Sequence, residues 1–80
     1  MTTEVDDELR RMAEYEASAE KVYDEMYHTR YPIGCYSEFK DLFAYAIGAA
    51  GRAGRPDEAE RLSKRLDHCK EVYRRQFSQF

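Results

Sequence analysis

Residues 39–66, FKDLFAYAIGAAGRAGRPDEAERLSKRL, decide the fold of this chain. Apolar residues recur every three or four positions up to Ala50, Gly51 and Gly54 interrupt the pattern, and the same spacing resumes from Ala59. This spacing is typical of one face of an amphipathic helix, and a glycine commonly ends a helix. The stretch therefore predicts two antiparallel helices joined by a tight turn.

The same pattern extends in both directions along the chain. Ser37 is a suitable N-cap for the second helix, and Pro56 suits the first position of the third helix. Towards the N-terminus, Tyr31-Pro32-Ile33-Gly34 should stop a long first helix, because a proline disfavours the helical conformation of the residue before it. We expect an all-α fold in a single domain of residues 1–80, a three-helix antiparallel bundle with helices at 4–29, 37–51 and 56–77.

The composition indicates a folded helical domain. Of the 80 residues, 42% are hydrophobic and 36% are charged, which is too apolar for a disordered tail. A run of roughly 18 apolar residues, as a membrane span requires, is missing, and the N-terminal residues are acidic where a secretory signal is basic. We therefore expect a cytoplasmic protein that does not bind membranes.

Charge is distributed unevenly along the sequence. Acidic residues predominate up to Thr29 and basic residues predominate after it, so the first helix should be acidic and the last helix basic. Opposite charges could bring the first helix onto the third helix of the same chain or of a second chain, and the sequence does not choose between them. With a net charge of −3, nucleic acid is an unfavourable partner.

Signatures of catalysis are missing from the sequence. It contains no glycine-rich phosphate loop, nucleophile elbow or His-Glu-x-x-His motif, so we expect no enzymatic activity and no cofactor. Antiparallel pairing places His28, Cys35, His68 and Cys69 at one end of the bundle, where they are the candidate metal ligands. Free thiols are the expectation for the two cysteines, with a disulfide between them as the alternative.

The same end of the bundle is rich in tyrosine. Tyr23, Tyr27 and Tyr31 are spaced by four residues, which aligns them along one side of a helix, and Tyr36 follows in the expected connection. Their rings either close the end of the core or form an exposed surface that binds a partner. The candidate partner-binding residues are Tyr23, Tyr27, Tyr31, Tyr36, Phe77 and Phe80.

Residues 39–73 resemble a single tetratricopeptide-type repeat. The resemblance rests on an aromatic residue and small residues in the second helix, a glycine at the turn, and the start of the third helix: Phe43, Ala46, Ala50, Gly54 and Asp57-Glu58-Ala59. The family consists of helix pairs that bind other proteins, so the resemblance implies a helical hairpin and a protein partner.

Three functions are compatible with these features. The first is a non-catalytic protein-interaction module, such as a small adaptor, a chaperone-like protein or a regulatory protein. The second is a homodimeric structural or assembly protein, because the expected first helix is about ten residues longer than the second and its apolar stripe needs cover. The third is a thiol or metal sensor at Cys35 and Cys69.

Overall fold

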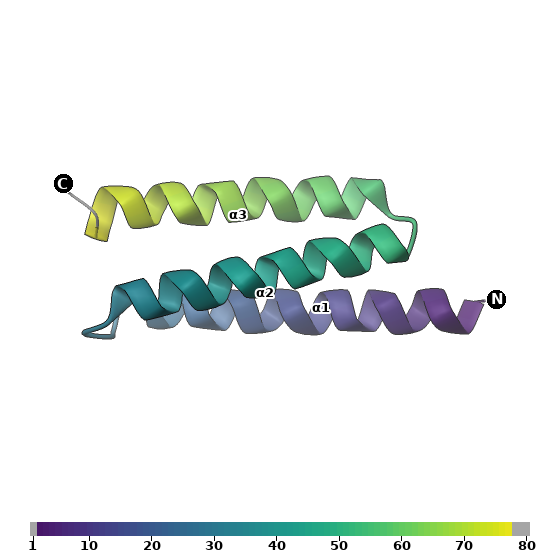
Figure 1. The fold of residues 1–80 in the computed structure, drawn as a ribbon, viewed down its shortest axis with the longest axis horizontal. Helices are drawn as coiled ribbons and strands as arrows, with labels where there is room; N and C mark the ends of the chain where they lie inside the picture. The colour runs from purple at the N-terminus through teal and green to yellow at the C-terminus, as the bar shows by residue number, and fades with distance from the viewer. Residues whose placement is uncertain (1, 78–80) are drawn as a thin grey trace.

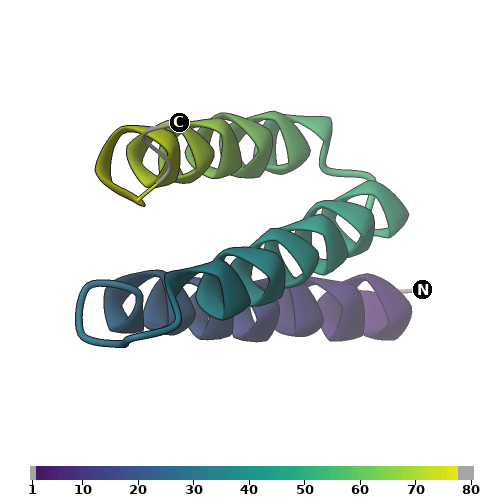
Figure 2. The same cartoon turned by 60° about the vertical axis from the view of Figure 1, so that its left-hand side comes forward.

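The structure, a computed structural model, describes residues 2–77 and consists of three helices in that range (Figure 1). They are α1 (Thr2–Glu25), α2 (Pro32–Arg52) and α3 (Pro56–Phe77). Helix α1 packs against α2, and α2 packs against α3, so α2 lies between its two neighbours (Figure 2). The prediction of an all-α three-helix bundle is confirmed.

The first connection differs from the prediction at both ends. Helix α1 ends at Glu25, and the following backbone N–H groups of Tyr27 and His28 donate to carbonyls three residues earlier, which forms a tight turn. Helix α2 begins at Pro32 instead of Ser37, because proline has a preset φ and needs no hydrogen-bond partner at the first helical position. Ser37 is therefore an exposed residue inside α2 and no N-cap.

This earlier start removes the predicted difference in helix length. Helix α1 has 24 residues and α2 has 21, so the expected overhang of about ten residues is absent. The homodimer hypothesis accordingly loses the argument from an uncovered end of the first helix.

The second connection agrees with the sequence. Gly54 has a φ of 71°, a conformation that glycine adopts without steric cost. The N–H of Arg55 donates to the carbonyl of Ala50 at 2.9 Å, and the N–H of Gly54 donates to that of Gly51 at 3.1 Å. These two bonds form a Schellman motif, which satisfies the last carbonyls of α2 and turns the chain into α3 at Pro56.

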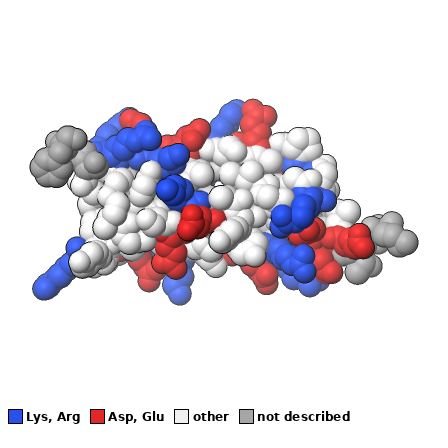
Figure 3. Space-filling view, viewed as in Figure 1, with Lys and Arg blue, Asp and Glu red and all other residues white. Residues whose placement is uncertain are grey.

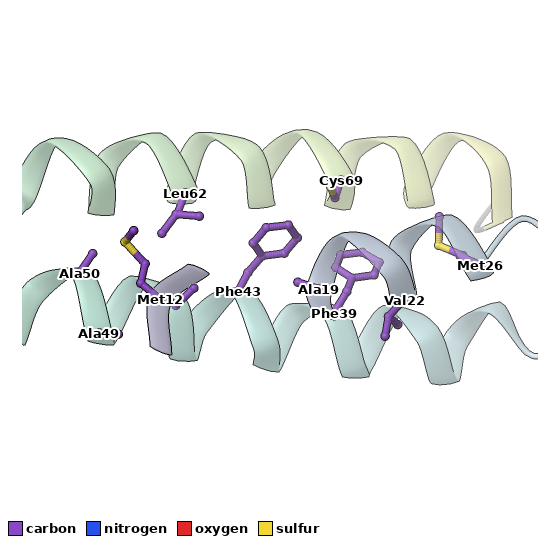
Figure 4. Packing of buried hydrophobic residues seen from close by; sticks show 11 residues of the cluster. Met12, Ala19, Val22, Met26, Phe39, Phe43, Ala49, Ala50, Leu62 and Cys69 are labelled. Carbon is purple, nitrogen blue, oxygen red and sulfur yellow. The ribbon is translucent and has the colours of Figure 1, made fainter. Parts of the chain in front are cut away.

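One apolar core joins all three helices (Figure 4). Helix α2 supplies Phe39 and Phe43, both with no exposed surface, and a row of buried alanines beside them. Full burial of a side chain of this size contributes about 1.5–3 kcal/mol relative to an exposed position. The buried members of the core are Met12, Ala19, Val22, Met26, Phe39, Phe43, Ala46, Ala49, Ala50, Leu62 and Cys69.

Ion pairs connect α1 to α3. Arg61 donates two hydrogen bonds to Glu16 at 2.8 and 2.9 Å, and Arg65 donates two to Glu20 at 2.7 Å each. The uneven charge of the sequence is thus used between the first and third helices of a single chain. Glu16, the polar residue that interrupts the apolar side of the first helix, is explained by its arginine partner.

Within residues 2–77, none of the helices is long and apolar enough to cross a membrane.

Candidate interaction site

Six aromatic rings meet where the end of α1, the start of α2 and the end of α3 come together. Each ring lies within 6.0 Å of another, measured between centroids. We call this group the aromatic cluster, and its members are Tyr23, Tyr27, Tyr36, Phe39, Tyr73 and Phe77.

The α2 and α3 half of the cluster is closely stacked. Tyr36 lies parallel to Tyr73 with their ring centroids 4.2 Å apart, and Tyr73 stacks in turn on Phe77 at 5.9 Å. The ring of Tyr36 also meets Phe39 edge to face at 5.4 Å. Each aromatic pair in these geometries stabilises the fold by about 0.5–1.5 kcal/mol beyond the contribution of its buried area. The stacked rings therefore hold the ends of α2 and α3 together.

The α1 half is held by hydrogen bonding and charge. The hydroxyl oxygens of Tyr23 and Tyr27 lie 3.1 Å apart, and the Arg65 guanidinium lies 5.3 Å from the centroid of the Tyr23 ring. Burial and the hydrogen bond with Tyr27 raise the pKa of Tyr23 well above its usual range. Tyr23 is partly buried, and its ring packs edge to face against Phe39 with 5.6 Å between centroids, so it serves as a packing residue.

Exposure separates the predicted partner-binding residues into two groups. Tyr23, Tyr36 and Phe77 are partly buried and close the end of the core. Tyr27 and Tyr31 remain 44% and 74% exposed. Phe80 lies outside the described residues.

Ile33 joins the exposed group and was not among the predicted site residues. It is 51% exposed in the first turn of α2, close in sequence to Tyr31. We call Tyr27, Tyr31 and Ile33 the tip patch. Ile33 was not predicted because residues 31–34 were expected to form a connection, whereas α2 begins at Pro32 and Ile33 lies in its first turn.

Tyr45 is an exposed aromatic residue outside the tip patch, and it was not among the predicted site residues. It is 55% exposed in the middle of α2, and its ring centroid lies 5.4 Å from that of Tyr15 on α1. It lies far along α2 from the tip patch, so it belongs to a different surface.

The metal-ligand candidates do not form a coordination site. Among residues 2–77 the structure contains no group of three or more histidine, cysteine, aspartate or glutamate side chains placed to hold a metal ion. His28 and His68 are exposed, whereas Cys69 is buried in the core and its thiol is free, as is that of Cys35. Burial raises the pKa of Cys69 to about 11, which makes the thiolate, the form that binds metals, scarce at neutral pH.

A polar cleft of about 300 Å³ lies near the N-terminal end of α1, at the opposite end of that helix from the tip patch. The carboxylate of Glu8 accepts hydrogen bonds from Arg52 at 2.7 Å and Arg11 at 3.3 Å, and these bonds lower its pKa. Glu8 is therefore an ion-pair partner that links α1 to α2 through Arg52.

Most basic side chains of α3 already have acidic partners. Besides the two ion pairs with α1, Lys64 pairs with Glu60 at 3.2 Å, and Arg74 and Arg75 both approach Glu71. These pairs place an acidic side chain beside Lys64, Arg74 and Arg75.

The chain has no significant match to any protein-family model, curated protein or solved structure. The resemblance to a tetratricopeptide-type repeat therefore stays a prediction.

Proposed function

We propose that the protein is a non-catalytic protein-interaction module that binds its partner through the tip patch. The observation that carries this proposal is the exposure of Tyr27, Tyr31 and Ile33 at 44%, 74% and 51% beside one connection. The three residues lie within six positions of one another in the sequence, and contiguous apolar patches on a surface commonly mark interaction sites.

The support beneath the patch favours binding. Tyr27 contacts Phe77 at 6.0 Å between ring centroids and shares a hydrogen bond with Tyr23. Its ring is therefore held before a partner arrives, which reduces the entropy lost on binding. Tyrosine also combines a large apolar contact area with a polar hydroxyl, a combination common at the centre of protein interfaces.

The patch can be tested by comparative affinity capture. The immobilised wild-type protein is compared with the double variant Tyr31→Ser/Ile33→Ser and with the control Tyr45→Ser, which changes an exposed aromatic residue elsewhere on α2. Circular dichroism verifies that all three proteins have the same helicity. We expect quantitative mass spectrometry to show proteins that the wild type and the control retain and the double variant loses.

Equal retention by all three proteins would contradict the proposed site. A candidate identified in this way is then titrated against each purified variant. An affinity loss of at least about tenfold for the double variant, with none for Tyr45→Ser, is the expected result, because interface aromatic residues commonly contribute more than 1.4 kcal/mol.

A further inference from the structure

A second surface runs along α2 and is independent of the tip patch. Asp41, Tyr45, Gly48 and Arg52 follow one another at intervals of four, three and four residues, which aligns them on one side of the helix. We call these four residues the α2 stripe. No charged residue separates Asp41 from Arg52, and Figure 3 shows broad uncharged areas across the middle of the molecule, on the side where α2 lies in front of α1.

The stripe is open to solvent. Asp41 is exposed, Tyr45 is 55% exposed, and 57% of the Arg52 side chain is exposed. Helix α1 borders the stripe, because the Tyr45 ring packs against Tyr15 and Arg52 donates to Glu8, and it leaves the outer side of Tyr45 and Arg52 exposed.

Among residues 2–77, only the side chain of Arg52 bounds the space above Gly48. The φ of Gly48 is not positive, and a methyl group added there would meet only the end of the flexible Arg52 side chain, at 3.3 Å. A glycine inside a helix costs up to about 1 kcal/mol relative to alanine. This loss of helix stability is offset if a group from another molecule packs in the space above Gly48.

We propose that a second copy of this chain packs its α2 antiparallel against this stripe about a two-fold axis. If Tyr45 lies opposite Gly48 of the second copy, the antiparallel register also places Asp41 opposite Arg52 of the second copy. The two-fold axis repeats both contacts, so each tyrosine fills the space over a glycine and each aspartate meets an arginine.

The charges favour this occupant. Within residues 2–77 Asp41 makes no ion pair, and Arg52 uses its Nε to donate to Glu8 at 2.7 Å. A guanidinium has further N–H donors, so Arg52 can keep this bond and still reach a second carboxylate. The antiparallel arrangement also places the positive end of one helix dipole beside the negative end of the other.

The size of the contact sets the expected affinity. One helix pair buries less surface than the roughly 1,200 Å² of a stable standard interface, so the dimer should be a transient one. We expect a dissociation constant between tens of micromolar and about one millimolar, within the range of weak complexes. Sedimentation equilibrium of the purified chain at concentrations up to about 1 mM is the appropriate measurement.

Charge reversal provides a specific test. In the variant Asp41→Arg, both ion pairs of the dimer become arginine–arginine contacts, and in Arg52→Glu both become carboxylate–carboxylate contacts. We expect each variant alone to dimerise at least about tenfold more weakly than the wild type. An equimolar mixture of the two should form a heterodimer, because both contacts between the two variants are attractive.

A second pair of variants tests the packing without changing charge. Gly48→Leu fills the space that Tyr45 of the second copy would occupy, and it replaces a poor helix former by a good one, so the monomer stays folded. Gly51→Leu is the matched control, because Gly51 is exposed, has open space around it and lies about 60° around the helix from Gly48. We expect only Gly48→Leu to abolish dimerisation.

The proposal is overturned by a monomer at 1 mM, by a dimer that Gly48→Leu leaves intact, or by charge variants that fail to associate when mixed while the wild type dimerises. These outcomes do not bear on the tip patch, whose residues are unchanged in every variant.

Discussion

The contacts of α2 and the outer edge between α1 and α3 are built from different interactions. Helix α2 meets its neighbours mainly through apolar side chains, beside the ion pair between Arg52 and Glu8, and its Phe39 and Phe43 have no exposed surface. Along the outer edge, Glu20 and Arg65 form a two-point ion pair and keep 34% and 37% of their side chains exposed. Burial of apolar surface should therefore supply most of the folding free energy, while the partly solvated ion pairs orient α3 relative to α1.

The largest expected effect is at Phe43. Replacing Phe43 by alanine removes a fully buried ring and should lower the free energy of unfolding by about 3–5 kcal/mol, which is comparable with the whole stability of so small a domain. Urea unfolding followed by circular dichroism measures this change. The control Tyr45→Ala, at an exposed position of the same helix, should cost less than about 1 kcal/mol. Similar losses for both variants would contradict the assigned core.

The ion pairs should have a smaller effect. A double-mutant cycle with Glu20→Gln and Arg65→Met isolates their coupling energy, which we expect to be about 0.5–1 kcal/mol because both groups are partly exposed. Glu60 and Lys64, an ion pair on α3 with more than two thirds of each side chain exposed, provide the reference cycle. A larger coupling energy for the reference pair would reverse our ranking of the two sites.

Acid should weaken the connection between α1 and α3 before it affects the apolar contacts. Hydrogen bonds from Arg61 lower the pKa of Glu16 from its ordinary value of 4.5. A lowered pKa in the folded state gives a stabilisation that is complete above the unfolded pKa and is lost as the pH falls through the folded value. We expect the melting temperatures of the wild type and Glu16→Gln to converge over an acid interval that begins at about pH 5 and extends below the lowered pKa of Glu16. A constant difference over this interval would exclude a contribution from Glu16 ionisation.

The alkylation rates of the two cysteine thiols should show how often the apolar core opens, and the measurement needs no substitution. Cys69 is fully buried and its pKa is raised to about 11, whereas Cys35 is only partly buried. In a mildly alkaline solution of an alkylating reagent, Cys35 should be modified first, and Cys69 should react only at the rate at which the core opens. Mass spectrometry of digested samples gives both rates, and equal rates would mean that the core near Cys69 is open.

The sequence was most informative where local chemistry alone determines the structure. Gly54 and Pro56 define the second turn and the start of α3 because each residue has a strong backbone preference, and the predicted range 56–77 matches the observed helix. Pro32 has an equally strong preference but an ambiguous meaning, since proline both stops one helix and begins another. The prediction used only the first meaning and began α2 five residues too late.

The candidate site was predicted less completely, because exposure depends on contacts between helices. Tyr23, Tyr27 and Tyr31 have the same spacing, yet the structure buries the first in part and leaves the last 74% exposed. Tyr23 lies on α1, where Phe39 and Arg65 approach it from the other two helices, whereas α1 ends at Glu25 and Tyr31 lies in the connection to α2. Residue spacing places side chains on one side of a helix, but it cannot show which of them a neighbouring helix covers.

The two ion pairs between α1 and α3 also fix how far one helix can slide along the other. Glu16 and Arg61 are 45 residues apart, as are Glu20 and Arg65, because the two helices run parallel. A slip of one turn, about 5.4 Å, brings Glu16 opposite Asp57 in one direction and Glu20 opposite the buried Cys69 in the other. Each slip keeps one arginine contact and leaves the other carboxylate facing an unfavourable neighbour. The two ion pairs together therefore favour a single register of α3 along α1.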